Sequence, residues 1–213
     1  MKKETLQKIL AFLIKTITKT EYFGLENLPK EGGVILALNH VSYMDTPLLL
    51  ANPIRQDITA LVTNKYEDIP FFSWFINTAK GIWINRDVAD FTAIRKAAKA
   101  LDKNVALGIA PEGTRSKTGQ LQEGKPGTIM LALKTGVPIV PVGMTGGQTA
   151  FKDLAHLRRP RLTVTFGKPF TLPPFKQGSR SKELIKWTHE LMLRIAALLP
   201  ESYRGFYRDK FSD

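Results

Sequence analysis

A histidine and an aspartate stand close together directly after an apolar run. The run is 34–38 (VILAL), and the segment that follows it, 39–45, reads NHVSYMD, which contains His40 and Asp45. Catalytic groups of α/β sheets gather at the carboxyl ends of strands, and this places His40 where chemistry is expected. A turn of this length can fold the Asp45 carboxylate back to the imidazole, where it would fix the ring tautomer and stabilise the protonated ring. The alternative is an aspartate that caps the next helix beside a structural histidine.

A second polar segment also follows an apolar run. Residues 105–110 (VALGIA) lead into the segment 111–116, which reads PEGTRS. The guanidinium of Arg115 offers a planar pair of donors for phosphate oxygens, and Gly113 lets the backbone approach a ligand closely. A buried Glu112 would orient that arginine. The alternative is a surface turn that carries an exposed Glu–Arg pair.

Together these segments resemble the glycerolipid acyltransferases, and within them the bacterial 1-acylglycerol-3-phosphate acyltransferases. The resemblance rests on Asn39-His40, four further residues and Asp45, and on the block Glu112-Gly113-Thr114-Arg115-Ser116. Two more blocks agree in order, Ile84-Asn85-Arg86 and the proline-containing run 137–142 (VPIVPV). In the second block Gly81 stands one position late and Trp83 replaces a Phe or Pro. The resemblance covers about residues 20–170.

The resemblance implies a role for each matching residue. The catalytic pair would be His40 and Asp45. The residues expected to bind the phosphate of the acceptor are Arg115, Arg86 and Lys65, the last in the segment Asn64-Lys65-Tyr66-Glu67. Those expected to support the active site are Asn39, Glu112, Gly113 and Thr114. No bound cofactor is expected, and the co-substrate would be a thioester of coenzyme A or of acyl carrier protein.

The residues that the sequence lacks narrow the mechanism. There is no cysteine, which excludes a thiol nucleophile and a cysteine-ligated metal, and there is no G-x-S-x-G elbow to carry a nucleophilic serine. His156 and His189 stand at no ligand-like spacing from His40, so no metal site is expected. His40 would therefore deprotonate a substrate hydroxyl that attacks the thioester directly, without an acyl-enzyme. Backbone N–H groups around Gly113 would stabilise the oxyanion.

The elements that position these residues alternate between short apolar runs and helical patterns. Strands are predicted at 34–38, 58–63, 82–85, 105–110, 138–142 and 161–166, and helices at 46–51, 70–79, 90–102, 126–135 and 181–199. Several strands are continuously apolar, which is typical of a sheet covered by helices on both faces. The order predicts a single α/β domain over 21–213, with a mixed, largely parallel sheet flanked by helices.

The first twenty residues are predicted to form an amphipathic helix that docks on a membrane. Within 3–18 one apolar stripe is expected from Leu6, Ile9, Leu10, Leu13, Ile14 and Ile17, and a basic side from Lys2, Lys3, Lys8, Lys15 and Lys19. The segment 69–76 (IPFFSWFI) would line an acyl groove or dip into the bilayer. For both segments the alternative is a core helix. The apolar run 9–14 is too short to cross a bilayer, and no signal peptide is expected.

The charge fits such a location. There are 31 Lys and Arg against 19 Asp and Glu, a formal charge of +12, which attracts anionic lipid and acidic acyl carrier protein, whereas no nucleic-acid module is found. Taken with this charge, the resemblance to the acyltransferases implies a peripheral enzyme of the cytoplasmic membrane face that acylates lysophosphatidic acid to phosphatidic acid. The short chain favours this acceptor over glycerol 3-phosphate, a lyso-phospholipid or a glycolipid. A non-catalytic membrane-binding protein is the remaining alternative.

Overall fold

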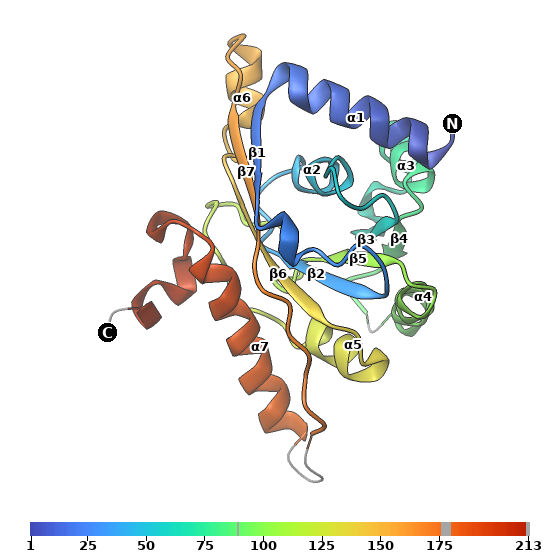
Figure 1. The fold of residues 1–213 in the computed structure, drawn as a ribbon, viewed down its shortest axis with the longest axis vertical. Helices are drawn as coiled ribbons and strands as arrows, with labels where there is room; N and C mark the ends of the chain where they lie inside the picture. Colours follow the sequence, from blue (N-terminus) through green and yellow to red (C-terminus); the bar gives the residue numbers. More distant parts are fainter. Residues whose placement is uncertain (89, 176–179, 212–213) are drawn as a thin grey trace.

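A central sheet organises the computed structural model, which describes residues 1–88, 90–175 and 180–211 (Figure 1). Within these residues the sheet has seven strands in the order β1-β7-β6-β2-β5-β3-β4. Along the chain they are β1 (Lys19–Phe23), β2 (Val34–Leu38), β3 (Ile58–Thr63), β4 (Ile82–Ile84), β5 (Ala106–Ile109), β6 (Ile139–Thr145) and β7 (Arg161–Phe166). Neighbouring strands are parallel except β6 and β7, which are antiparallel. The expected mixed, largely parallel α/β sheet is confirmed.

Helices cover both faces of the sheet (Figure 1). They are α1 (Lys3–Ile17), α2 (Asp45–Leu50), α3 (Pro70–Thr78), α4 (Phe91–Asp102), α5 (Gly127–Thr135), α6 (Ala150–Ala155) and α7 (Arg180–Ala197), with short 3₁₀ turns at Leu25–Asn27, Asn64–Tyr66, Glu201–Tyr203 and Gly205–Phe211. The two faces form two cores. One contains apolar residues of α1, α2 and α3, and the other contains residues of α4, α5 and α7.

Strand β2 shows why its sequence is apolar throughout. All five of its residues are buried. Successive side chains of a strand point to opposite faces, so Leu36 enters the core beneath α2 while Ile35 enters the core beneath α5 and α7. The neighbouring strand β5 carries Gly108, where a Cβ atom would lie 2.6 Å from the Leu49 side chain of α2. This close approach brings α2 down onto the sheet directly behind the turn that follows β2.

Two elements were not expected. Strand β1 has the sequence KTEYF, which contains no apolar run, and it pairs in parallel with β7 at the edge of the sheet. Helix α6 is six residues long and lies between the predicted strands 138–142 and 161–166, where no helix was predicted. Strand β6 also continues to Thr145, beyond the run that predicted it. The carboxyl ends of β2 and β5 lie side by side, because these two strands are paired in parallel.

Helix α1 has apolar side chains on two sides rather than one stripe. Leu6 and Ile14 pack into the core, whereas Ile9, Phe12 and Leu13 are exposed. Among the described residues, no helix is sufficiently long and apolar to pass through a bilayer.

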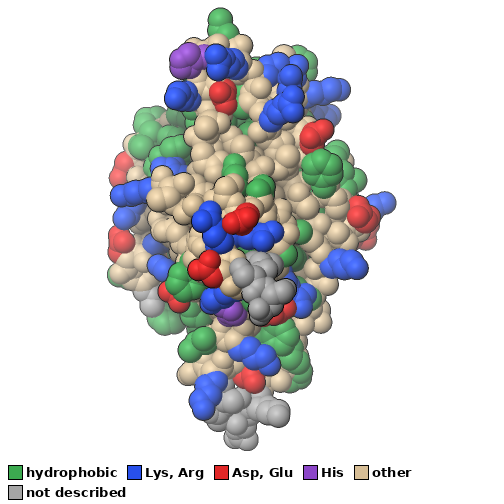
Figure 2. All heavy atoms as spheres, turned by 90° about the vertical axis from the view of Figure 1, so that its left-hand side faces the viewer, with side chains coloured by type: hydrophobic (Ala, Val, Ile, Leu, Met, Phe, Trp, Pro, Cys, Tyr) green, Lys and Arg blue, Asp and Glu red, His purple; other side chains and the backbone are tan. Residues whose placement is uncertain are grey.

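Figure 2 shows the face that carries α6 and α7, where basic side chains gather near α6. The exposed basic residues in and directly after α6 are Lys152, Arg158, Arg159 and Arg161.

Candidate active site

His40 and Asp45 form a hydrogen-bonded pair at the carboxyl end of β2. The imidazole Nδ1 lies 2.7 Å from Asp45 Oδ2. Because an ionised carboxylate only accepts, Nδ1 carries the proton in this pair and Nε2 is left as the basic nitrogen. The Asp45 side chain is 1% exposed and that of His40 is 22% exposed, so the pair is buried at the carboxylate and open at the ring. This is the geometry of a general base held by a buried acid.

The same Asp45 oxygen is held by the backbone. The N–H groups of Val41 and Ser42 each donate to Oδ2 at 2.9 Å. Together with the ring Nδ1, these donors fix the position of the carboxylate relative to the imidazole. Within the described part of the chain, the other oxygen, Oδ1, is buried without a hydrogen bond. Gly147 packs against this turn, since a Cβ atom there would lie 2.6 Å from Ser42 Cβ.

Glu112 supports His40 rather than the neighbouring arginine. Its Oε1 accepts the backbone N–H of His40 at 2.8 Å, and its Oε2 accepts the backbone N–H of Gln122 at 2.9 Å. The Ser116 N–H in turn donates to the His40 carbonyl at 2.8 Å. Burial raises the pKa of Glu112, and the hydrogen bonds from His40 and Gln122 oppose that rise. The expectation that Glu112 orients Arg115 is therefore wrong, because its partners lie elsewhere.

Asn39 joins the end of β2 to β6. Its side-chain Nδ2 donates to the Met144 carbonyl at 2.9 Å, and its Oδ1 accepts the Met144 N–H at 2.7 Å. The amide thus replaces a backbone partner at the point where the strands separate. This fixes the position from which the chain turns into His40.

Arg115 lies within an aromatic cluster that the sequence reasoning missed. Its guanidinium carbon is 3.7 Å from the centroid of the Tyr43 ring, and the Tyr43 hydroxyl is 3.3 Å from that of Tyr66. The hydrogen bond with Tyr66 and the contact with Arg115 lower the pKa of Tyr43. Phe72 packs against both tyrosines. The position of Tyr43 inside the segment 39–45 was the one available signal for this cluster.

The other two candidate phosphate ligands lie in different surroundings. Arg86 follows β4 and, with Gly113, lines a cavity of about 1020 Å³. Lys65 is exposed, and its Nζ lies 3.5 Å from Asp87 Oδ2, so a neighbouring carboxylate already partners it. Thr114 is exposed. Of the expected set, His40, Asp45, Asn39 and Glu112 are joined by direct hydrogen bonds or through adjacent backbone, and Lys65 stands apart.

The large cavity lies at the carboxyl ends of the strands, between α4 and α5. Most of its lining is apolar, including Leu61, Ile84, Phe91, Ile94, Ile109 and Leu131, and basic side chains such as Arg86, Lys125 and Lys134 border it. No residue of 69–76 belongs to this lining. In that segment Phe75 and Ile76 are buried while Phe71 and Trp74 are exposed. The expectation that 69–76 lines an acyl groove is not met by this cavity.

The backbone near Gly113 offers donors, although not from the glycine itself. The Gly113 N–H already donates to the Ala110 carbonyl at 3.0 Å. The N–H groups of Thr114 and Arg115 make no hydrogen bond with any described residue. The described residues contain no group of three or more His, Cys, Asp or Glu side chains that could hold a metal ion.

Comparison with known proteins places these residues in a family. The family model described as Acyltransferase matches residues 19–145, a range that contains every candidate site residue. A 1-acyl-sn-glycerol-3-phosphate acyltransferase of Borreliella burgdorferi is 36% identical over 121 residues, covering 56% of this chain and 48% of that protein. One of Pseudomonas aeruginosa is 32% identical over 132 residues, covering 60% and 50%. The chain thus spans about half the length of these curated relatives.

A solved structure extends the similarity to nearly the whole chain. The crystal structure of the 1-acyl-sn-glycerophosphate (LPA) acyltransferase, PlsC, from Thermotoga maritima matches with a TM-score of 0.70 and 26% identity. The match covers 92% of this chain and 79% of that one.

Proposed function

The chain belongs to the acyltransferase family, and on that premise we propose that it transfers a fatty acyl group from a thioester to the free hydroxyl of 1-acylglycerol 3-phosphate, forming phosphatidic acid. The observation that carries the proposal is the contact of 2.7 Å between His40 Nδ1 and Asp45 Oδ2, which leaves a basic Nε2 on an accessible ring. The names of the relatives support the choice of acceptor.

The proposed reaction is a direct transfer. His40 Nε2 takes the proton of the acceptor hydroxyl as its oxygen bonds to the thioester carbonyl carbon. The tetrahedral intermediate collapses, the carbon–sulfur bond breaks, and the protonated His40 returns the proton to the departing thiolate. Asp45 stabilises the imidazolium in between. The N–H groups of Thr114 and Arg115, which lack described partners, are the proposed oxyanion donors.

Binding of the phosphate is assigned to two arginines. The guanidinium of Arg115 is stacked on Tyr43, beside the turn that carries His40, and Arg86 borders the large cavity. Planar guanidinium groups suit the oxygens of a phosphate monoester. Lys65 is exposed and faces Asp87, so the two arginines are the favoured ligands of the phosphate. The apolar cavity of about 1020 Å³ is the proposed site of an acyl chain.

We further propose that residues 1–20 dock the enzyme on an anionic membrane as a peripheral protein at its cytoplasmic face. Phe12, at 69% exposure, and its neighbours Ile9 and Leu13 form an apolar outer face of α1. Near the carboxyl end of this helix, Leu157 is 96% exposed, and the guanidinium of Arg159 binds the Lys15 and Thr18 carbonyls. Exposed apolar side chains with basic neighbours suit a bilayer interface.

The docking proposal can be tested with a single fluorescent label, since the chain has no cysteine. An environment-sensitive dye on Phe12→Cys is expected to shift to shorter wavelength with vesicles that contain phosphatidylglycerol. The same dye on Ser181→Cys, at the start of α7, is the control and is expected to stay unchanged. Equal responses at both positions would contradict docking through α1.

The proposed function is tested by an acceptor panel. Purified protein in mixed micelles receives lysophosphatidic acid, glycerol 3-phosphate or lysophosphatidylcholine, each with acyl-CoA and with acyl carrier protein thioester, and products are identified by mass spectrometry. Phosphatidic acid formed from lysophosphatidic acid alone is expected. Preferential acylation of either other acceptor would replace the proposed substrate, and the more active thioester identifies the donor.

A further inference from the structure

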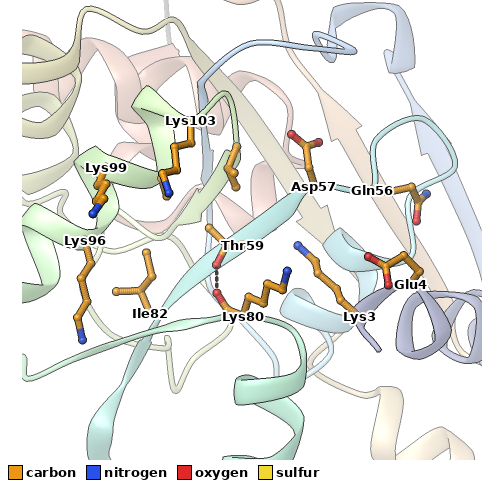
Figure 3. A pocket seen from close by; sticks show the side chains of 12 residues that line it. Lys3, Glu4, Gln56, Asp57, Thr59, Lys80, Ile82, Lys96, Lys99 and Lys103 are labelled. Atoms are coloured by element: carbon orange, nitrogen blue, oxygen red, sulfur yellow. Dashed lines mark hydrogen bonds between the residues drawn. The ribbon is translucent and has the colours of Figure 1, made fainter. Parts of the chain in front are cut away.

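A second cavity, of about 460 Å³, opens at the end of the sheet opposite to His40 (Figure 3). It lies where β3 and β5 begin, whereas His40 follows the carboxyl end of β2, and these three strands run parallel. Five lysines are among the described residues that line it: Lys3, Lys80, Lys96, Lys99 and Lys103. The carboxylates in the same lining are those of Glu4 and Asp57.

The lysines come from separate elements and border the cavity from two sides. Lys96, Lys99 and Lys103 project from the α4 side, and Lys3 of α1 and Lys80 from the turn before β4 lie opposite (Figure 3). Lysines near the carboxyl end of a helix are favourable through its dipole, and this explains Lys99 and Lys103. It does not explain why Lys3 and Lys80 share the same cavity, because like charges repel one another.

The positive charge of this cavity is not neutralised within it. None of the five lysines forms an ion pair within 4.0 Å in the described part of the chain. Asp57 already accepts two hydrogen bonds from the guanidinium of Arg55, at 2.7 and 2.9 Å. Five lysines against Glu4 and Asp57 leave a formal excess of three positive charges in the lining.

Lys3 is a buried lysine in the lining of this cavity. It is 9% exposed, and its Nζ donates to the Ile58 carbonyl at 2.5 Å. An ammonium group has three donors, so two remain for a ligand. Burial lowers the pKa of Lys3 to about 8, and the charge of Asp57 opposes this shift. The other residues of the described lining are Gln56, Thr59, Ile82, Ala100 and Val105.

We propose that this lysine cavity is a binding site for a phosphate-bearing anion, separate from the candidate active site. Lysine is a common phosphate ligand in proteins, and the volume lies in the range of small-molecule sites. The phosphate could belong to a soluble metabolite or to a lipid headgroup, because α1, the proposed membrane helix, forms one wall. A bound anion would hold α1 against α4.

The lysine cavity and the large cavity share one helix in their linings. Helix α4 lines both: Lys96 and Lys99 border the lysine cavity, whereas Phe91 and Ile94 border the apolar one. An anion that restrains α4 therefore acts on an element that both sites share. The proposal does not depend on the assigned acyl transfer, because its test measures binding.

The test compares two triple variants of equal charge. Lys96→Gln/Lys99→Gln/Lys103→Gln removes the α4 lysines, and Lys168→Gln/Lys182→Gln/Lys186→Gln removes three exposed lysines outside the basic cluster near α6. Both are made in a background with Arg86→Ala and Arg115→Ala, so that anions do not bind at the candidate active site. Circular dichroism confirms that each variant is folded. The background alone is the reference.

Two arms identify the source of the phosphate. Isothermal titration with inorganic pyrophosphate measures a soluble anion, and sedimentation with phosphatidylcholine vesicles, with and without phosphatidic acid, measures a headgroup. In at least one arm we expect saturable binding that weakens at least about tenfold in the α4 variant and is retained in the control variant. Equal weakening in both variants would show that net charge, and not this cavity, controls the binding, and it would overturn the proposal. Absence of binding in both arms would overturn it as well.

Discussion

Replacing Asp45 by asparagine removes one charge from the candidate catalytic pair while keeping its shape. In the native pair, Asp45 Oδ2 lies 2.7 Å from His40 Nδ1 and also accepts the N–H groups of Val41 and Ser42. The amide oxygen of asparagine can accept the same donors. What is lost is the attraction between a carboxylate and the imidazolium that forms when His40 takes the proton.

The size of this loss follows from Coulomb's law. At a separation of about 4 Å and an effective dielectric constant of about 20, two unit charges attract by about 4 kcal/mol. That value applies here because Asp45 is 1% exposed and the ring is 22% exposed, so water screens the pair weakly. At about 1.4 kcal/mol per tenfold change in rate, Asp45→Asn is expected to lower kcat about 10³-fold.

The assay is the steady-state transfer of an acyl group to lysophosphatidic acid, with kcat and KM determined separately. The KM for the acceptor is expected to stay within about threefold, because a loss confined to the transition state leaves substrate binding intact. Asp153→Asn is the matched control: it removes a carboxylate that accepts a hydrogen bond in the first turn of α6, far from His40 in sequence. A folded Asp45→Asn enzyme with kcat reduced less than tenfold would refute the reasoning.

Three further outcomes are expected. Arg115→Ala should raise the KM for lysophosphatidic acid about 10- to 100-fold, since hydrogen bonds to charged groups contribute about 1.5–3 kcal/mol, and an unchanged KM in the same assay would remove Arg115 from the phosphate site. The pKa of Lys3 is lowered from 10.5 to about 8 in the folded protein. Between these pH values the unfolded chain binds more protons than the folded one, so the free energy of unfolding in urea should rise with pH, by up to about 3 kcal/mol. Lys3→Met should lack this increment, and a wild-type increment in that variant would contradict the assignment. Arg55 is 1% exposed and donates to the Pro29, Gly32 and Asn104 carbonyls as well as to Asp57. Each carbonyl that loses its donor costs about 1–3 kcal/mol, so Arg55→Met should lower the free energy of urea unfolding by about 3–5 kcal/mol. A loss below about 1 kcal/mol would be inconsistent with these contacts.

The contact between His40 and Asp45 was predictable because the relevant information is local. His40 and Asp45 lie in one turn, and the apolar run before them marks the end of a buried strand. The same holds for the α/β class, since strands buried on both faces read as apolar runs. Strand β1 could not be found in this way, because KTEYF becomes a strand by pairing with β7, which lies far along the chain.

The contacts between distant segments were beyond the reach of sequence patterns. Glu112 and Arg115 are close in sequence, which suggested that they interact, yet Glu112 turns to the His40 N–H and Arg115 stacks on Tyr43. The lysine cavity joins residue 3 to residues 80 and 96–103. Such contacts depend on how helices settle on the sheet, and no spacing rule within one segment describes them.

The most direct test of the proposed mechanism is acyl transfer by His40→Ala. Wild-type and variant protein are assayed side by side in mixed micelles, with phosphatidic acid measured by mass spectrometry and folding confirmed by circular dichroism. Loss of the imidazole is expected to reduce the rate of phosphatidic acid formation about 10²–10⁴-fold, the range of general-base catalysis, while the fold is preserved. Near wild-type turnover in folded His40→Ala would show that the pair of His40 and Asp45 is not the catalytic centre.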